Sequence, residues 1–241
     1  MLNNGYIGLI ASVYSEVKGF ESTLERAGET LPGHPAFYSG KIRGRAVVLA
    51  ISGIGKTNAA HAATILIERY SPGCVINLGI GGAYPSSGLR VGDIAVAEKE
   101  IYADEGVLLE DGLCTLEITG IPLLKTGRRK YFNEFPADKR LAGLAAKAAG
   151  TVGNCRSGVF LTVSSCTGTA QRAAELEARF SPLCENMEGA AIAHICSIYG
   201  VSFVEVRGIS NIVEARDMRK WDVRKAAENC RKAARAFIEV I

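Results

Sequence analysis

Short apolar runs alternate with longer amphipathic stretches along most of this chain. Strands that are buried on both faces of a parallel sheet read as continuous apolar runs, whereas helices carry apolar residues three or four positions apart. The runs predict strands at residues 6–11, 45–51, 74–78, 93–97, 157–163 and 202–209, and the amphipathic stretches predict helices at 16–27, 57–70, 138–149, 169–178, 187–199 and 222–240. This alternation predicts a three-layer α/β fold, with a central mixed, mostly parallel twisted sheet flanked by helices.

The chain has 241 residues and no Pro/Ser-rich linker, repeat or low-complexity tract. We therefore expect one domain over residues 1–241. The least regular stretch, residues 98–135, is interrupted by Gly112, Gly120, Pro122 and Gly127. A segment of that size inside a compact domain is usually a lid or a subunit contact.

Charge and cysteine content narrow the range of partners. The 28 Lys and Arg against 25 Asp and Glu indicate neither nucleic acid nor a membrane surface, so we expect a small-molecule partner. No apolar run approaches the ~18 residues of a membrane span, and no signal peptide is expected. Seven widely spaced cysteines predict no metal site and no disulfide framework. We expect a cytoplasmic protein without a cofactor.

Two glycine-rich turns resemble nucleotide loops without matching them. The turn at 52–57 would need Gly at position 50 to be a phosphate loop, and Ala50 is there. The turn at 77–83 would need Gly at 84 to be a dinucleotide fingerprint, and Tyr84 is there. Each turn either only reverses the chain or lets a ligand approach the backbone at the carboxyl ends of the strands, where open α/β sheets bind ligands.

Five short motifs follow one another in a specific order: Ser-Glu-Val at 15–17, Ser-Gly-Ile-Gly-Lys at 52–56, Asn-Leu-Gly-Ile-Gly-Gly at 77–82, Asn-Met-Glu-Gly-Ala-Ala at 186–191 and Val-Arg-Gly-Ile-Ser at 206–210. Together they resemble the purine and uridine phosphorylase superfamily. Within it, the chain is similar to the nucleosidases that cleave 5′-methylthioadenosine and S-adenosylhomocysteine, and closer still to the futalosine hydrolases of the menaquinone pathway. The resemblance also implies a homo-oligomer, a dimer or higher.

The resemblance implies a role for each of three side chains. Cleavage of an N-glycosidic bond leaves positive charge on the ribose and negative charge on the departing base, so it needs a carboxylate, a base for water and a donor to the purine. By resemblance Glu188 holds the ribose hydroxyls beside the backbone of Met187, Glu16 deprotonates water, and Asn211 meets the purine. The alternatives are a Glu188 that favours the helix dipole, a solvated Glu16 and an Asn211 that caps a turn.

Asn211 stands where the family usually has Asp. An Asn amide does not titrate, but its NH2 group can donate to N7 and to a neighbouring carbonyl oxygen. It therefore favours a 6-oxopurine, hypoxanthine or guanine, over adenine. Ser210 is expected to orient Asn211 or the nearby backbone, and Arg207 is expected to form a structural ion pair.

Further positions are implied to bind the rest of the substrate. Gly82 brings the backbone of its turn close to the ligand, and Phe160 and Leu161 either contact the base or belong to the core. Ile54 and Trp221 face the 5′ substituent, where an indole can stack on an aryl ring. The cations of residues 216, 219 and 220 are candidates for a 5′ carboxylate, and a lid rim is the alternative for this loop.

The first loop, residues 11–16, offers Glu16 and no arginine. Phosphate needs cationic donors, so this loop favours hydrolysis over phosphorolysis. The expected reaction is hydrolysis of futalosine to hypoxanthine and dehypoxanthine futalosine. The alternatives are cleavage of 5′-methylthioadenosine, S-adenosylhomocysteine or aminodeoxyfutalosine, and a non-catalytic nucleoside-binding protein on the same fold.

Overall fold

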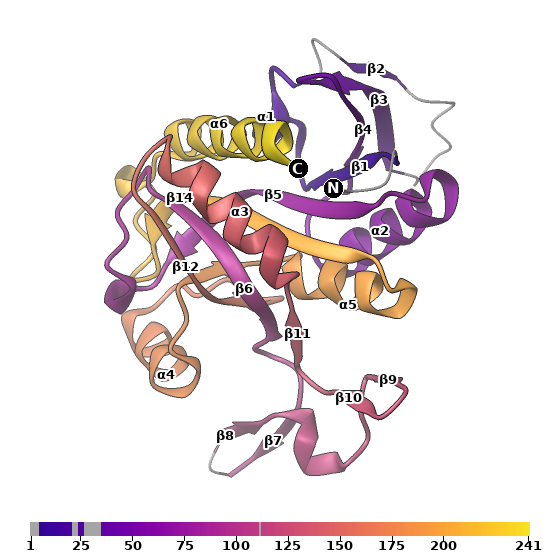
Figure 1. The fold of residues 1–241 in the computed structure, drawn as a ribbon. Helices are drawn as coiled ribbons and strands as arrows, with labels where there is room; N and C mark the ends of the chain where they lie inside the picture. Colours follow the sequence, from indigo (N-terminus) through magenta and orange to yellow (C-terminus); the bar gives the residue numbers. More distant parts are fainter. Residues whose placement is uncertain (1–4, 21–23, 27–34, 111) are drawn as a thin grey trace.

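The computed structural model describes residues 5–20, 24–26, 35–110 and 112–241 (Figure 1). Ten strands form the main sheet, and nine of them follow one another in space as β11 (Glu134–Pro136), β6 (Ile94–Tyr102), β12 (Cys155–Thr162), β13 (Cys184–Asn186), β5 (Cys74–Ala83), β1 (Ile7–Ala11), β4 (Arg45–Ile51), β3 (Ala36–Ile42) and β2 (Leu24–Arg26). The tenth, β14 (Ser202–Ile212), pairs with both β5 and β6.

The pairing of β14 turns half of this sheet into a closed ring. β14 runs parallel to β5 and antiparallel to β6, and β12 and β13 complete the circle back to β5. On the other side of β5, β1 and β4 continue the sheet in parallel. The parallel strands β1, β4, β5 and β14 therefore end at the same edge, and the short strand β13 crosses antiparallel to β5 there.

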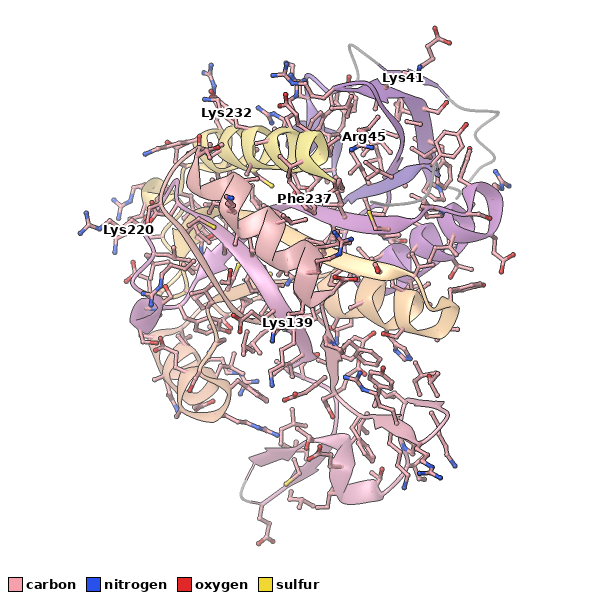
Figure 2. All side chains as sticks on the ribbon, viewed as in Figure 1. Lys41, Arg45, Lys139, Lys220, Lys232 and Phe237 are labelled. Carbon is pink, nitrogen blue, oxygen red and sulfur yellow. The ribbon has the colours of Figure 1, made fainter. Side chains whose placement is uncertain are left out.

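Helices cover both faces of the sheet. α2 (Lys56–Tyr70) packs against α5 (Gly189–Tyr199), while α1 (Tyr14–Val17) and α3 (Lys139–Gly150) pack against α6 (Val223–Val240) on the other side (Figure 1). The side chain of Phe237 points from α6 into the core (Figure 2). α4 (Ala170–Phe180) lies near the carboxyl end of β12. The α/β architecture with a central mixed sheet is confirmed.

A glycine sets how closely α6 approaches the sheet. A side chain at Gly208 would collide with the carbonyl oxygen of Ala226, so only glycine lets this helix lie against β14. The close contact holds the segment of β14 that carries Arg207 and Ser210.

The predicted helix at residues 16–27 is wrong. α1 ends at Val17, because Lys18 leaves the helical region and Gly19 has a φ of +101°. The chain then forms β2, which pairs antiparallel with β3, a strand that was not predicted. Residues 21–23 and 27 of that prediction lie outside the described residues. The other predicted helices and all six predicted strands are present, with ends shifted by a few residues.

The irregular stretch begins later than predicted, since β6 extends to Tyr102. Beyond it, β7 (Val107–Leu109), β8 (Gly112–Cys114), the 3-10 turn η3 (Leu116–Thr119), β9 (Leu124–Thr126) and β10 (Arg129–Tyr131) form an arm that projects from the body (Figure 1). In the described part of the chain, no helix is long and apolar enough to cross a membrane.

Candidate active site

A cavity of about 270 Å³ opens at the edge where the parallel strands end. Its wall is contributed by the segments that follow β1, β4 and β13, by the last residues of β5 and β14, and by two loops: Ser12, Val13, Glu16, Ile54, Ile80, Gly81, Gly82, Cys166, Thr167, Glu185, Asn186, Met187, Glu188, Arg207, Ser210, Asn211, Arg216 and Trp221. Eight of the ten predicted site residues are among them. The structure thus brings together residues that lie more than two hundred positions apart in the chain.

Glu16 is buried and held by backbone donors. Its Oε2 accepts hydrogen bonds from the backbone N of Ser12 and Val13, at 3.0 and 3.2 Å, and its Oε1 accepts one from Ile80 N at 2.9 Å. Gly79 has to be glycine, because a side chain there would collide with this carboxylate. Burial raises the pKa of Glu16, while Arg207 and the backbone donors partly offset that rise.

Glu188 follows β13 and occupies the N-cap position of α5, yet its side chain caps nothing. Its Oε1 accepts a hydrogen bond from Gly55 N at 3.0 Å, and its Oε2 lies 3.4 Å from Nη2 of Arg207. Asn186 performs the capping instead, since its Oδ1 accepts from the backbone N of Glu188 and Gly189. The carboxylate of Glu188 is therefore free of the helix and faces the cavity.

Arg207 connects the acids below the cavity. Its Nε donates to Glu205 at 2.6 Å and its Nη1 to Ile80 O at 3.1 Å, in addition to the ion pair with Glu188. Burial would lower its pKa, but the neighbouring carboxylates, led by Glu205, raise it instead. The predicted ion pair is confirmed, and Arg207 also lines the cavity beside Glu16, which the sequence interpretation did not anticipate.

Asn211 reaches the cavity because β14 bulges. The register of β14 against β5 shifts between Ile209 and Asn211, and such a bulge redirects the side chains around it. Ser210 Oγ donates to Asn211 Oδ1 at 2.7 Å, and Asn211 Nδ2 donates to Ile212 O at 3.1 Å. One N–H of the amide therefore remains for a ligand. Ser210 orients Asn211, as predicted.

Phe160 and Leu161 do not line the cavity. Both are fully buried on β12, Phe160 against a cluster that includes Leu89 and Leu183, and Leu161 against one that includes Tyr84. Their strand is paired on both sides, so successive side chains enter the two opposite cores. The residues that reach the cavity from this part of the chain are Cys166 and Thr167, a few positions beyond the strand.

Three further buried acids were not predicted, Glu185, Glu205 and Glu100, and Glu185 lines the cavity. Glu205 and Glu100 are both fully buried, and Glu100 accepts hydrogen bonds from Thr162 Oγ1 at 2.6 Å and Asn186 Nδ2 at 2.7 Å. Burial and the charge of Glu205 raise the pKa of Glu100. The signal for Glu205 was present in the sequence, because it lies two residues before Arg207 in an apolar strand and thus on the same face.

The comparisons with known proteins agree with this geometry. Residues 6–239 match the family model described as the phosphorylase superfamily. The chain is 34% identical to 5′-methylthioadenosine/S-adenosylhomocysteine nucleosidase of Halalkalibacterium halodurans over 90% of this chain and 89% of that protein. It is 36% identical to futalosine hydrolase of Thermus thermophilus over 86% of this chain and 89% of that protein.

Solved structures of similar fold include two nucleosidases of the same name. The enzyme of Neisseria meningitidis, in complex with methylthio-immucillin-A, superposes with a TM-score of 0.83 at 24% identity, covering 98% of this chain and 100% of that chain. The enzyme of Colwellia psychrerythraea, in complex with adenine, gives 0.82 at 26% identity, covering 98% and 96%. The chain therefore belongs to the phosphorylase superfamily and is an enzyme of the nucleosidase kind within it.

Proposed function

We propose that this protein hydrolyses the N-glycosidic bond of futalosine and releases hypoxanthine and dehypoxanthine futalosine in menaquinone biosynthesis. The observation that carries the proposal is the orientation of Asn211, whose Oδ1 accepts from Ser210 while one N–H remains for a ligand. This N–H donates to the acceptor edge of a 6-oxopurine. Ser210 occupies one acceptor position of the amide oxygen, and an N–H donor facing the base suits the O6 acceptor of a 6-oxopurine better than the 6-amino donor of adenine.

The two acids divide the remaining chemistry. Glu188 accepts hydrogen bonds from the ribose hydroxyls and stabilises positive charge on the sugar. Glu16 removes a proton from water, whose oxygen bonds to C1′ as the bond between C1′ and N9 breaks and its electron pair leaves with the base. Asn211 donates to the departing base and disperses its negative charge. The carboxylates of Glu16 and Glu188 approach the same guanidinium, which supports their action on one sugar.

The first loop supports hydrolysis over phosphorolysis. The backbone N–H groups of Ser12 and Val13 are donors of the kind that bind phosphate, but both already donate to Glu16. A buried carboxylate at this position also repels an anion. Water is therefore the better acceptor of the ribosyl group.

Cleavage of 5′-methylthioadenosine or S-adenosylhomocysteine is the second candidate. It is favoured by relatives such as the Halalkalibacterium halodurans protein, which carries that name. Aminodeoxyfutalosine, the 6-amino analogue of futalosine, is a further candidate substrate. A non-catalytic nucleoside-binding protein would explain the cavity but would not need the buried Glu16 and Glu188.

We further propose a cytoplasmic homo-oligomer. All seven cysteines are free, which suits a reducing compartment. The projecting arm exposes Leu108 and Ile121 by 78% and 73%, and Ile118 on the same arm by 56%. Exposed apolar side chains gathered on one projection are typical of an interaction surface. A second copy of the chain would cover them.

The test is release of base from futalosine, inosine, 5′-methylthioadenosine and aminodeoxyfutalosine, each with and without phosphate. We expect futalosine to have the highest kcat/KM, and phosphate to make no difference. Faster cleavage of 5′-methylthioadenosine, or a requirement for phosphate, would overturn the assignment. Binding of futalosine without any turnover would indicate the non-catalytic alternative.

A further inference from the structure

Two arginines line the cavity, and they differ in how their charges are balanced. Arg207 is buried and lies against Glu205 and Glu188, so its charge is compensated within the protein. Arg216 is exposed at the mouth of the cavity. Among the residues that the structure describes, no carboxylate lies within ion-pair distance of Arg216. Arg216 is thus the cavity cation whose charge is not compensated by a described carboxylate.

The neighbouring cations of the same loop are already paired. Arg219 Nε lies 2.8 Å from Asp217, and Lys220 Nζ lies 2.7 Å from Glu214. The side chain of Lys220 points outward from the edge of the molecule (Figure 2). Neither Arg219 nor Lys220 lines the cavity. The positive charge offered to a ligand from this loop therefore comes from Arg216.

The Arg216 guanidinium contacts the Cys166 thiol and the Trp221 ring, and these contacts do not use all of its N–H donors. Its Cζ lies 4.8 Å from the centre of the Trp221 ring, so the guanidinium packs over the indole. A guanidinium carries five N–H donors, so contact with one thiol and one ring leaves several of them available for a carboxylate. The backbone N of Arg216 also donates to Gly168 O at 3.3 Å, which ties the loop to the segment after Thr167. Arg216 is positioned before a ligand binds.

A gradient of burial indicates which end of the substrate meets Arg216. Glu188 and Asn211, assigned to the ribose and the base, are only 4% and 9% exposed. Ile54 on the rim is 57% exposed, and Arg216 also lies at the surface. A nucleoside with its base and sugar in the buried part must direct its 5′ substituent toward the rim.

We propose that Arg216 binds an anionic group at the far end of the 5′ substituent, and that this ion pair selects nucleosides that carry a carboxylate there. The inference rests on the proposed function, since it assumes that the base and ribose bind at Asn211 and Glu188. Arg216 would then distinguish a substrate with an anionic 5′-aryl group from one with a neutral 5′-thioether. Trp221 supports the aryl group and Arg216 recognises its charge.

Four probe nucleosides separate recognition of the base from recognition of the anion. They combine hypoxanthine or adenine with a 5′-arylthio group that carries either a carboxylate or the isosteric carboxamide. For each base, we expect the wild-type protein to prefer the carboxylate by about tenfold in kcat/KM, mainly through KM. In Arg216→Gln, the ratio should fall to near one because the carboxylate probe loses affinity.

Arg219→Gln is the matched control, since it removes an exposed arginine of the same loop that is paired with Asp217. Its carboxylate-to-carboxamide ratio should stay at the wild-type value. An equal loss on both probes in Arg216→Gln, or an unchanged ratio, would overturn the proposal. Preference for adenine with the carboxylate ratio intact would instead reject the proposed base and leave the role of Arg216 supported.

Discussion

At the scale of single residues, one guanidinium organises the acids of the site. Arg207 pairs with Glu205 and Glu188, and its charge opposes the rise in the pKa of Glu16 that burial causes. A buried arginine with fewer acids around it would lower the stability of the fold, because its charge would be uncompensated. The buried acids would destabilise the fold in the same way without the arginine. The charged state of the two acids in the cavity, Glu16 and Glu188, therefore depends on Arg207 and its pairing with Glu205.

Glu188→Gln and Glu16→Gln should each lower kcat/KM at least a hundredfold, about 2.7 kcal/mol in barrier. Both changes keep the size of the side chain but remove the charge that the ribosyl cation or the water requires. The measurement is steady-state hydrolysis of futalosine together with thermal unfolding. Glu175→Gln, an exposed position on α4, is the control and should retain wild-type rates. Near-native activity in a folded Glu16 or Glu188 variant would refute the role of that residue.

The pH profile should report Glu16. Its pKa is raised above its ordinary value, mainly by burial. A base acts only when deprotonated, so kcat/KM should fall on the acidic side at a higher pH than an ordinary glutamate would give. A profile of log kcat/KM against pH checks this, with inosine as a second substrate without a 5′ acid. An acidic limb at the ordinary glutamate pKa would show that another group limits the reaction.

Asn211→Asp should move the preference toward a 6-amino purine. An ionised Asp would place an acceptor against N7 and O6 of hypoxanthine, leaving polar groups unpaired at a cost of about 1–3 kcal/mol. A protonated Asp donates to N7 and accepts from the amino group of adenine. We expect the kcat/KM ratio of aminodeoxyfutalosine to futalosine to rise about tenfold and the rate to become pH-dependent. Should both activities fall by the same factor, position 211 does not distinguish the bases.

At the scale of elements, the start of α5 is fixed by the acids below it. Gly189 is the first residue of the helix, and a side chain there would collide with the carboxylates of Glu205 and Glu100. Thr162 and Asn186 hold the same turn, since Thr162 Oγ1 accepts from Ala190 N at 2.7 Å. The position of Glu188, next to Gly189, therefore depends on strands β6 and β14 as well as on its own helix.

Gly189→Ala should destabilise the protein by about 3 kcal/mol or more, because the buried carboxylates have no room to move. Gly143→Ala in α3 is the matched control. A Cβ at Gly143 would meet none of the described heavy atoms within 4 Å, so this change should stabilise the helix by about 0.5–1 kcal/mol. Urea unfolding measures both. Equal effects of the two substitutions would mean that the acids do not constrain the turn.

At the scale of the whole molecule, the projecting arm is the expected contact between subunits. The Leu108→Lys, Ile121→Lys double variant places two charges on the most exposed apolar positions of that arm. We expect it to sediment as a monomer, whereas the wild-type protein sediments as a dimer or larger. Val240→Lys, an exposed apolar position on α6, is the control and should not change the oligomer. A monomeric wild-type protein would reject the oligomer.

Much of the secondary structure could be predicted from local pattern. The apolar run at 74–78 and the amphipathic stretch at 57–70 indicated β5 and α2, because burial imposes periods that a few neighbouring residues reveal. The helix predicted from Glu16 failed because Gly19 adopts a positive φ and the following residues pair with a distant strand. Strand pairing of that kind has no signal within a short window.

The sequence by itself determined the α/β class, because periodicity is a local property, and its resemblance to a known superfamily singled out Glu16, Glu188 and Asn211. Only the tertiary structure decided which side chains contact one another and which of them reach the cavity. The register of β14 on β5 brings Arg207 to Glu188, and the bulge before Asn211 turns its amide to the cavity. The pairing of β12 on both sides buries Phe160. Contacts between residues far apart in the chain follow from strand register and packing, which depend on the whole fold at once.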